Sequence, residues 1–131
     1  ALEAANMAGF GRHGEPFAAY FNRWDLKVHV MTLASGEVAG FAISGAEGRG
    51  QSAKVFLYEL HVAAAHRGRG YASALLELVE NSGTARTGSG KMVELNVHEA
   101  NANARGFYAR VGFVESGKTS GGAVLVMRRR R

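Results

Sequence analysis

The sequence predicts an α/β (α+β) fold in which a mixed β-sheet is flanked by helices. Two observations indicate this fold. Segments rich in β-branched and aromatic residues alternate with segments whose apolar residues recur every three or four positions, the helical spacing. The order strand, turn, helix, strand between residues 54 and 97 is typical of a right-handed crossover between parallel strands. We therefore expect a parallel strand pair.

Length and composition predict a single domain over residues 1–131, with 47% hydrophobic and 21% charged residues. No apolar run approaches the roughly 18 residues that cross a membrane, and no signal peptide is recognisable. We therefore expect no membrane partner and a cytoplasmic location, with the nucleus as an alternative. The net charge of +5 favours an anionic partner. Four of the cations, Arg128–Arg131, are expected to form a solvated basic tail at residues 128–131.

The first part of the chain predicts one helix and a hairpin. Pro16 suits a first helical turn, so a helix is expected over residues 16–24. The β-favouring segments Lys27–Leu33 and Glu37–Ser44 flank a Ser-Gly pair, which predicts two strands joined by a two-residue turn. Residues 45–52 (GAEGRGQS) are expected to form a loop.

The central part predicts a buried strand followed by a helix. Lys54–Val62 (KVFLYELHV) alternates only loosely between apolar and polar residues, which suits a strand buried on both faces. After a glycine-rich turn, an apolar stripe predicts a helix, which we expect Gly83 to end. The residues of that stripe are Ala72, Leu75, Leu76 and Val79. Residues 83–90 are an expected loop.

The last part predicts one strand, one helix and two short closing strands. Lys91–Val97 is the strand that completes the crossover. Asn101 suits the N-cap of a helix that Gly112 ends. The apolar face of that helix comprises Ala104, Phe107, Tyr108 and Val111. The closing strands are expected at Phe113–Glu115 and Ala123–Arg128.

The turn from His66 to Ser73 (HRGRGYAS) has the character of an anion site. It lies between a strand and a helix N-terminus, where unpaired amides and the helix dipole favour a negative charge. Gly68 and Gly70 allow positive φ and a close approach of the backbone, and the two neighbouring arginines add donors. The turn therefore predicts a cradle for a diphosphate.

The glycine-rich turn has three other interpretations. A dinucleotide-binding fingerprint needs a third Gly or Ala where Ser73 stands, and a P-loop needs a lysine that neither glycine-rich segment supplies. A strand-to-helix turn with no ligand remains the structural alternative.

Two spaced motifs resemble the GCN5-related N-acetyltransferase (GNAT) superfamily. Arg67-x-x-Gly70-x-Ala72 is similar to its Arg/Gln-x-x-Gly-x-Gly/Ala motif, and the segment from Asn101 to Phe113 (NANARGFYARVGF) is similar to Asn-x-x-Ala-x-x-Phe/Leu-Tyr followed by Gly-Phe. The resemblance covers Val28 to about Val126 and implies a largely antiparallel twisted sheet with a central parallel pair. It also implies acetyl-CoA as cosubstrate. Because the family begins with a further strand and helix, the domain is expected to be N-terminally shortened.

The segment Tyr58–Val62 leading into Arg67 resembles the histone-directed protein N-terminal acetyltransferases of the NatD type, although Tyr108 departs from that subgroup. This resemblance implies a protein N-terminal amine as the preferred acceptor. Acetylation of lysine or of a small-molecule amine is the alternative. A basic nucleic-acid-binding module and a catalytically silent coenzyme A binder are different classes that stay open, and a monomer and a homodimer both remain compatible.

Acetyl transfer to an amine needs a proton acceptor, and Glu59 is the candidate base, with His61 on the same strand face as the alternative. The resemblance implies that Tyr108 protonates the departing thiolate or donates a hydrogen bond to it. The structural alternatives are an ion pair for Glu59 and core packing for His61 and Tyr108. For Asn101, a purely capping role is compatible with cofactor contact.

The remaining predicted site residues combine the turn with what the resemblance implies. The cofactor-binding residues would be Leu60, His61, Val62, Arg67, Gly68, Arg69, Gly70, Tyr71, Ala72, Ser73 and Asn101. Tyr58 would bind the acceptor, and Asn96 on the facing strand would contact the acceptor or the acetyl group. No metal is expected, because the five histidines show no paired ligand spacing and the chain has no cysteine. A hydrolase triad is not expected, because no Gly-x-Ser-x-Gly elbow is present.

Overall fold

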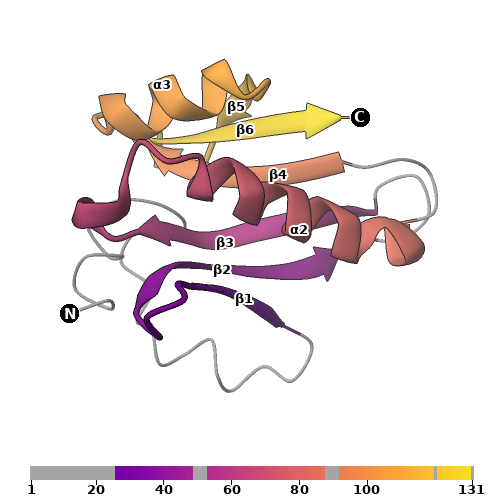
Figure 1. Cartoon of the computed structure of the whole chain (residues 1–131). Helices are drawn as coiled ribbons and strands as arrows, with labels where there is room; N and C mark the ends of the chain where they lie inside the picture. Colours follow the sequence, from indigo (N-terminus) through magenta and orange to yellow (C-terminus); the bar gives the residue numbers. More distant parts are fainter. Residues whose placement is uncertain (1–25, 49–52, 88–91, 120, 131) are drawn as a thin grey trace.

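A computed structural model of the chain describes residues 26–48, 53–87, 92–119 and 121–130. These residues form a six-stranded sheet with the strand order β1-β2-β3-β4-β6-β5 (Figure 1). The strands are β1 (Lys27–Thr32), β2 (Val38–Glu47), β3 (Lys54–Val62), β4 (Met92–His98), β5 (Val114–Lys118) and β6 (Val124–Arg130). All neighbouring strands are antiparallel except β3 and β4, which are parallel. The expected mixed sheet with one central parallel pair is confirmed.

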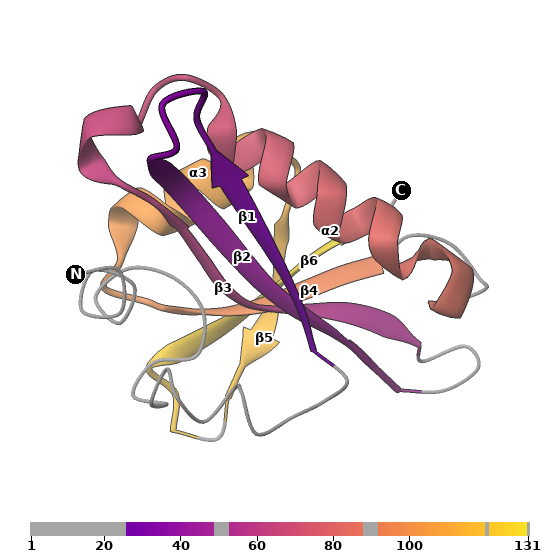
Figure 2. The ribbon, with the colours of Figure 1, turned by 60° about the horizontal axis from the view of Figure 1, so that its bottom comes forward.

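Helix α2 (Tyr71–Thr87) connects the two parallel strands and lies across the sheet, as Figures 1 and 2 show. A short 3₁₀ helix, η3 (Ala64–His66), precedes it. Helix α3 (Ala102–Arg110) follows β4 and begins as predicted, because Asn101 Oδ1 accepts a hydrogen bond from the Ala104 amide at 3.2 Å. The helix predicted for residues 16–24 lies outside the described residues.

Several predicted boundaries were wrong. Strand β5 runs to Lys118 and β6 to Arg130, and the connection between β1 and β2 spans residues 33–37 instead of two residues. Gly83 does not end α2, which continues to Thr87. A single helical glycine costs only about 1 kcal/mol relative to alanine, too little to end a helix by itself. Strand β2 also extends into the predicted loop, because Gly45–Glu47 pair with Lys54–Phe56 of β3. Pairing with β3 therefore lengthened β2, and the glycine left α2 uninterrupted.

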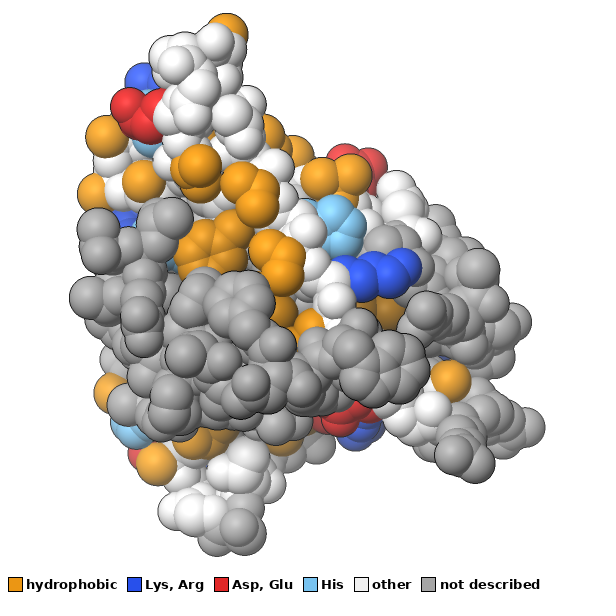
Figure 3. All heavy atoms as spheres, turned by 90° about the horizontal axis from the view of Figure 1, so that it is seen from below, with side chains coloured by type: hydrophobic (Ala, Val, Ile, Leu, Met, Phe, Trp, Pro, Cys, Tyr) orange, Lys and Arg blue, Asp and Glu red, His pale blue; other side chains and the backbone are white. Residues whose placement is uncertain are grey.

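The sheet is apolar on both faces. The larger buried cluster joins residues of both helices, such as Leu76 and Ala104, to the strands. A second cluster comprises Phe41, Ile43, Phe56 and Tyr58, with Leu26 packed against it. The surface seen from below Figure 1 is accordingly rich in hydrophobic side chains (Figure 3), and Val28 and Val30 of edge strand β1 are 47% and 51% exposed. Strand β3 is buried along nearly its whole length, as its loose alternation predicted.

A β-bulge interrupts β3 at Tyr58. The adjacent residues Ile43 and Ser44 of β2 pair with Glu59 and Leu57, respectively. Tyr58, which lies between Leu57 and Glu59, therefore has no pairing partner in β2. An extra residue in one strand reverses which side chains face which side of the sheet. The bulge therefore brings Tyr58 and Glu59 to the same face, away from α2.

The same reversal shifts the apolar contacts of β3. Before the bulge Val55 and Leu57 belong to the cluster beneath α2, and after it Leu60 and Val62 do. The odd-numbered positions beyond the bulge, including His61, thereby face the second cluster, where His61 packs against Phe41 with ring centroids 5.9 Å apart. A strict two-residue period does not predict this change.

The two parallel strands pair over a short distance only. Val55–Leu57 of β3 pair with Val93–Leu95 of β4, and the recorded pairing stops there. Beyond this point the two ribbons separate (Figure 2). The edge of Leu60–Val62 that faces β4 therefore has no strand beside it among the described residues. This separation lies next to the turn that leads into α2.

The basic run is not the solvated tail that the sequence predicted. Its first three residues belong to β6, and Arg128 Nε lies 3.2 Å from Glu94 Oε2. Arg129 is only 6% exposed, and its guanidinium donates to Glu80 Oε2 of α2 at 3.0 Å and to the Val111 carbonyl oxygen at 2.9 Å. Strand alternation directs Arg129 toward the helices, where a buried carboxylate compensates its charge.

Replacement of Arg129 by methionine should lower the free energy of unfolding by about 3–5 kcal/mol, because the buried Glu80 carboxylate would lose its cation. The matched control is Arg128→Met, at a side chain that is 47% exposed, for which solvent screening limits the expected loss to about 1 kcal/mol. Urea denaturation followed by circular dichroism measures both. Equal losses in the two variants would contradict a specific role for the buried pair.

Candidate active site

The turn between η3 and α2 depends on two glycines. Gly68 and Gly70 both have φ of +80°, a conformation that side chains with a Cβ rarely adopt. A Cβ built at either position would meet no atom within 4 Å. The requirement for glycine is therefore conformational, and it matches the positive φ predicted from the sequence.

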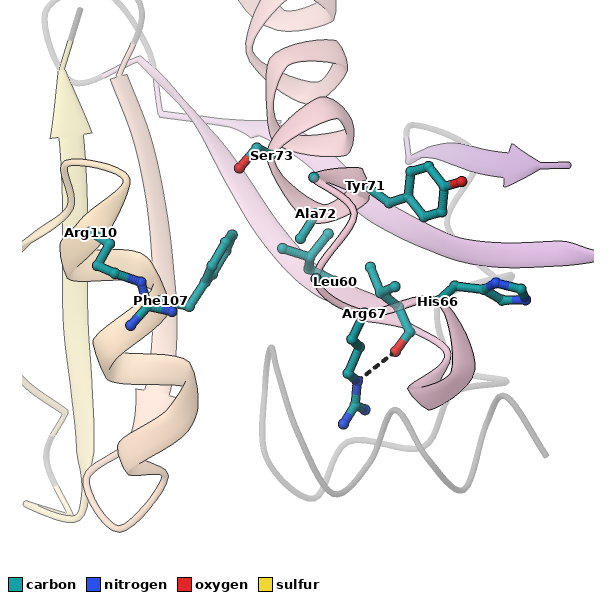
Figure 4. Close-up of a pocket in the computed structure, with 11 residues that line it drawn as sticks. Leu60, His66, Arg67, Tyr71, Ala72, Ser73, Phe107 and Arg110 are labelled. Atoms are coloured by element: carbon teal, nitrogen blue, oxygen red, sulfur yellow. Dashed lines mark hydrogen bonds between the residues drawn. The ribbon is translucent and has the colours of Figure 1, made fainter.

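Side chains on both sides hold the turn in place. Arg67 Nε donates to the carbonyl oxygen of Val62, the last residue of β3, at 3.0 Å (Figure 4). His66 Nε2 contacts the Glu37 carboxylate, which lies beside the β1–β2 turn. The turn is thus tied to β3 and to the hairpin, and the rest of the Arg67 guanidinium remains available to a ligand.

The N-terminal end of α2 has the properties of an anion site. The first intrahelical hydrogen bond runs from the Ala74 amide to the Gly70 carbonyl oxygen at 3.1 Å, so the amides of Tyr71, Ala72 and Ser73 precede the helical ladder. No acidic residue lies in the first turn of the helix. Amides and helix dipole together favour a bound phosphate at this point.

A cavity of about 300 Å³ lies at this turn (Figure 4). It is lined by Leu60, Val62, His66, Arg67, Gly68, Gly70, Tyr71, Ala72, Ser73, Phe107 and Arg110. Two of these lining residues are arginines and none is acidic. Its volume is at the small end of the range for ligand sites, roughly 300–1,000 Å³. The donors present fit a phosphorylated ligand that extends from the turn toward β3.

The cavity brings together eight of the eleven residues predicted for the cofactor, namely Leu60, Val62, Arg67, Gly68, Gly70, Tyr71, Ala72 and Ser73. The other three, His61, Arg69 and Asn101, do not line it. Three lining residues, His66, Phe107 and Arg110, were absent from the predicted set. Phe107 and Arg110 lie three positions apart on α3, so the helical period places both on one face. That spacing was the signal that could have found Arg110.

The two predicted catalytic residues, Glu59 and Tyr108, lie outside the lining of this cavity and are both fully buried. Burial, and secondly the nearby Glu59 carboxylate, raise the pKa of the Tyr108 phenol well above its ordinary value. Tyr108 therefore remains protonated at neutral pH and can donate a hydrogen bond. Its ring packs at 5.4 Å from that of Phe107, which does line the cavity.

His61, the alternative base, is 3% exposed. Burial, and secondly the Arg67 cation, hold the pKa of the His61 imidazole below its usual value. The ring is therefore neutral at physiological pH, which is the form that accepts a proton. By the β2–β3 register it lies on the same face as Glu59, as predicted from their spacing.

The other predicted site residues lie at separate positions near the point where β3 and β4 separate. Tyr58 is buried, and its hydroxyl donates to the Glu47 carboxylate at the end of β2. Asn96 is partly buried and comes directly after Leu95, where the pairing of β4 with β3 stops. Asn101 caps α3.

The described residues contain no group of three or more His, Cys, Asp or Glu side chains placed to hold a metal ion. Within the same ranges, no helix combines the length and the apolar character that crossing a membrane requires.

Comparisons with solved structures find the same fold. Naa20 from Chaetomium thermophilum, solved with a bisubstrate analogue, has a TM-score of 0.72 at 18% identity, over 98% of this chain and 80% of that one. A nourseothricin acetyltransferase has a TM-score of 0.69 at 28% identity, over 82% of this chain and 66% of that one. The PaiA N-acetyltransferase from Thermoplasma acidophilum, solved with coenzyme A, has a TM-score of 0.67 at 18% identity, over 87% and 66%.

This chain therefore spans slightly less than two thirds of the length of the last two proteins. A family model described as the acetyltransferase (GNAT) family matches residues 2–113, which is most of the chain. The motif resemblance, the sheet with its separating parallel strands and the family model agree, and the chain belongs to the GNAT family of acetyltransferases.

Proposed function

We propose that this chain binds acetyl-CoA and transfers the acetyl group to a primary amine. The observation that supports this proposal best is the position of the cavity. Its glycine turn offers amides to a diphosphate, and its other end reaches Leu60 and Val62. There the edge of β3 that faces β4 has no strand beside it among the described residues. A ligand with a phosphorylated end and a narrow amide-bearing arm matches both features.

The turn holds the diphosphate through main-chain amides and Arg67, and Arg69 on the exposed surface of the turn adds a second cation. The pantetheine arm follows the open edge of Leu60–Val62 and forms strand-like hydrogen bonds with the main chain. Acetyl-CoA supplies the acetyl group as a thioester, whose carbonyl carbon a neutral amine attacks. Binding along β3 directs the reacting end toward the bulge at Tyr58 and Glu59.

Glu59 accepts the proton that the amine loses, directly or through one water molecule. A carboxylate held within the protein suits this role, and Glu59 is fully buried. Tyr108 donates its phenolic hydrogen to the sulfur that leaves when the carbon–sulfur bond breaks. The raised pKa of Tyr108 keeps that hydrogen in place until then. Neutral His61 is the alternative proton acceptor.

For the acceptor we propose a protein N-terminal amine. The bulge places Tyr58 beside Glu59 on one face, which is the pair that resembles the N-terminal acetyltransferases. An α-amine has a pKa of about 8, against about 10.4 for lysine, so a single carboxylate base is sufficient near neutral pH. The second candidate is a small-molecule amine, which the 28% identity to a nourseothricin acetyltransferase favours.

A basic nucleic-acid-binding module has less support than its charge suggested. Arg129 is buried against Glu80 and is therefore not presented to a polyanion, and the exposed Arg128 shares the Glu94 carboxylate with Lys54.

Gly70→Ala should weaken coenzyme A binding about tenfold, because alanine favours negative φ and turns the neighbouring amides away from the diphosphate. Gly122→Ala is the matched control, since Gly122 also has positive φ (+78°), has open space at its Cβ and lies outside the cavity. Isothermal titration calorimetry with coenzyme A measures both. Equal affinities in the two variants would contradict diphosphate binding by the glycine turn.

Glu59→Gln should lower turnover at neutral pH about 100-fold or more while leaving the affinity for coenzyme A nearly unchanged. The defect should diminish as the pH rises, because a growing fraction of the amine is then neutral without help. Rates from about pH 6 to about pH 9 test this, with His61→Gln measured in parallel. If only His61→Gln lowers the rate, His61 is the base. Wild-type rates in Glu59→Gln at every pH would refute the role of Glu59 as base.

A panel of acceptors tests the substrate class. Peptides with free N-termini should be acetylated fastest, and the same peptides with a blocked N-terminus and an internal lysine should react slowly. Polyamines and nourseothricin are the small-molecule arm. Release of the coenzyme A thiol measures the rate, and mass spectrometry locates the acetyl group. Activity on the small amines alone would end the preference for a protein N-terminus.

A further inference from the structure

We propose that Arg110 of α3 is a second anion-binding residue, which closes the cofactor cavity from the side opposite the glycine turn and binds a phosphate group of coenzyme A. The inference rests on the proposed function and assigns a new residue to the same site. It starts from a difference between the two arginines of α3.

Arg105 and Arg110 lie on the same nine-residue helix but differ in their contacts. Arg105 donates to the Glu99 carbonyl oxygen at 2.9 Å and to Glu115 Oε1 at 2.8 Å. The side chain of Arg110 forms no hydrogen bond or ion pair with any other residue that the structure describes, and Arg110 lines the cavity. An arginine without a carboxylate beside a cavity is a candidate for an anionic ligand.

The position of Arg110 relative to the turn strengthens this interpretation. In Figure 4, Arg110 extends from α3 on one side of the cavity, and Arg67 and the start of α2 lie on the other. Gly106, one helical turn earlier, leaves room for this side chain, because a Cβ there would lie 3.4 Å from Arg110 Nη1. Two guanidinium groups around one cavity repel each other, and an anion between them relieves that repulsion.

Phe107, three positions before Arg110, provides the apolar part of the same wall. Its ring points toward the start of α2 in Figure 4. Helix α3 therefore presents an aromatic ring and a cation to the cavity. This combination suits a ligand that has an apolar portion next to a phosphate. Coenzyme A carries negative charge at two places, the diphosphate and the 3′-phosphate.

The test compares Arg110→Gln with Arg105→Gln, which removes the same charge from the same helix away from the cavity. Both side chains are at least partly exposed, so both variants should fold. Calorimetry with coenzyme A, 3′-dephospho-coenzyme A and pantetheine separates the phosphates. Arg110→Gln should weaken coenzyme A binding roughly 10- to 100-fold relative to Arg105→Gln and leave pantetheine binding unchanged. Arg110→Lys, which keeps the charge, should recover part of the affinity.

The three ligands also locate the contact. A loss for coenzyme A alone identifies the 3′-phosphate, and an equal loss for the dephosphorylated form identifies the diphosphate; both support the proposal. An unchanged affinity for coenzyme A in Arg110→Gln, or an equal loss for pantetheine, would overturn it while leaving the proposed function intact. Failure of the unaltered protein to bind coenzyme A would overturn the proposed function, and this inference with it.

Discussion

The separation of β3 from β4 is the constraint on which the candidate site depends. Two parallel strands that paired over their whole length would satisfy each other's main-chain groups and leave no open edge between them. Here the pairing covers three residues of each strand, and the chain then leaves β3 through a turn into α2. An extended ligand can therefore pair with a strand inside the sheet, which otherwise happens only at a sheet edge.

The bulge at Tyr58 makes this separation chemically useful. It moves Glu59 onto the face where His61 also lies, in a region that is almost fully excluded from solvent. Burial lowers the pKa of the His61 imidazole and raises the pKa of the Tyr108 phenol. It favours the neutral imidazole of His61 and the protonated phenol of Tyr108, so an acceptor and a donor of protons coexist at one pH. Burial therefore widens the pH range over which the neutral imidazole and the protonated phenol coexist.

The buried arginine of β6 connects the two walls of the cavity. Arg129 binds the Glu80 carboxylate of α2 and the carbonyl oxygen of Val111, the residue that follows Arg110. It also lies over the ring of Phe113, with its Cζ 5.1 Å from the ring centroid. The Arg129 guanidinium of β6 thus contacts both α2 and the end of α3. It fixes the position of one helix relative to the other.

The sequence by itself determined the local features of this protein. The β-branched segments, the capping Asn101 and the positive-φ glycines were predictable, because each depends on the conformational preferences of a few neighbouring residues. The family motifs added the expectation of the sheet and of the turn. Only the tertiary structure decided the bulge, the length of the β3–β4 pairing, the burial of Arg129 and the position of Arg110 at the cavity. These features depend on contacts between residues that are distant in the chain, and the free energy of such contacts is not encoded in any local pattern.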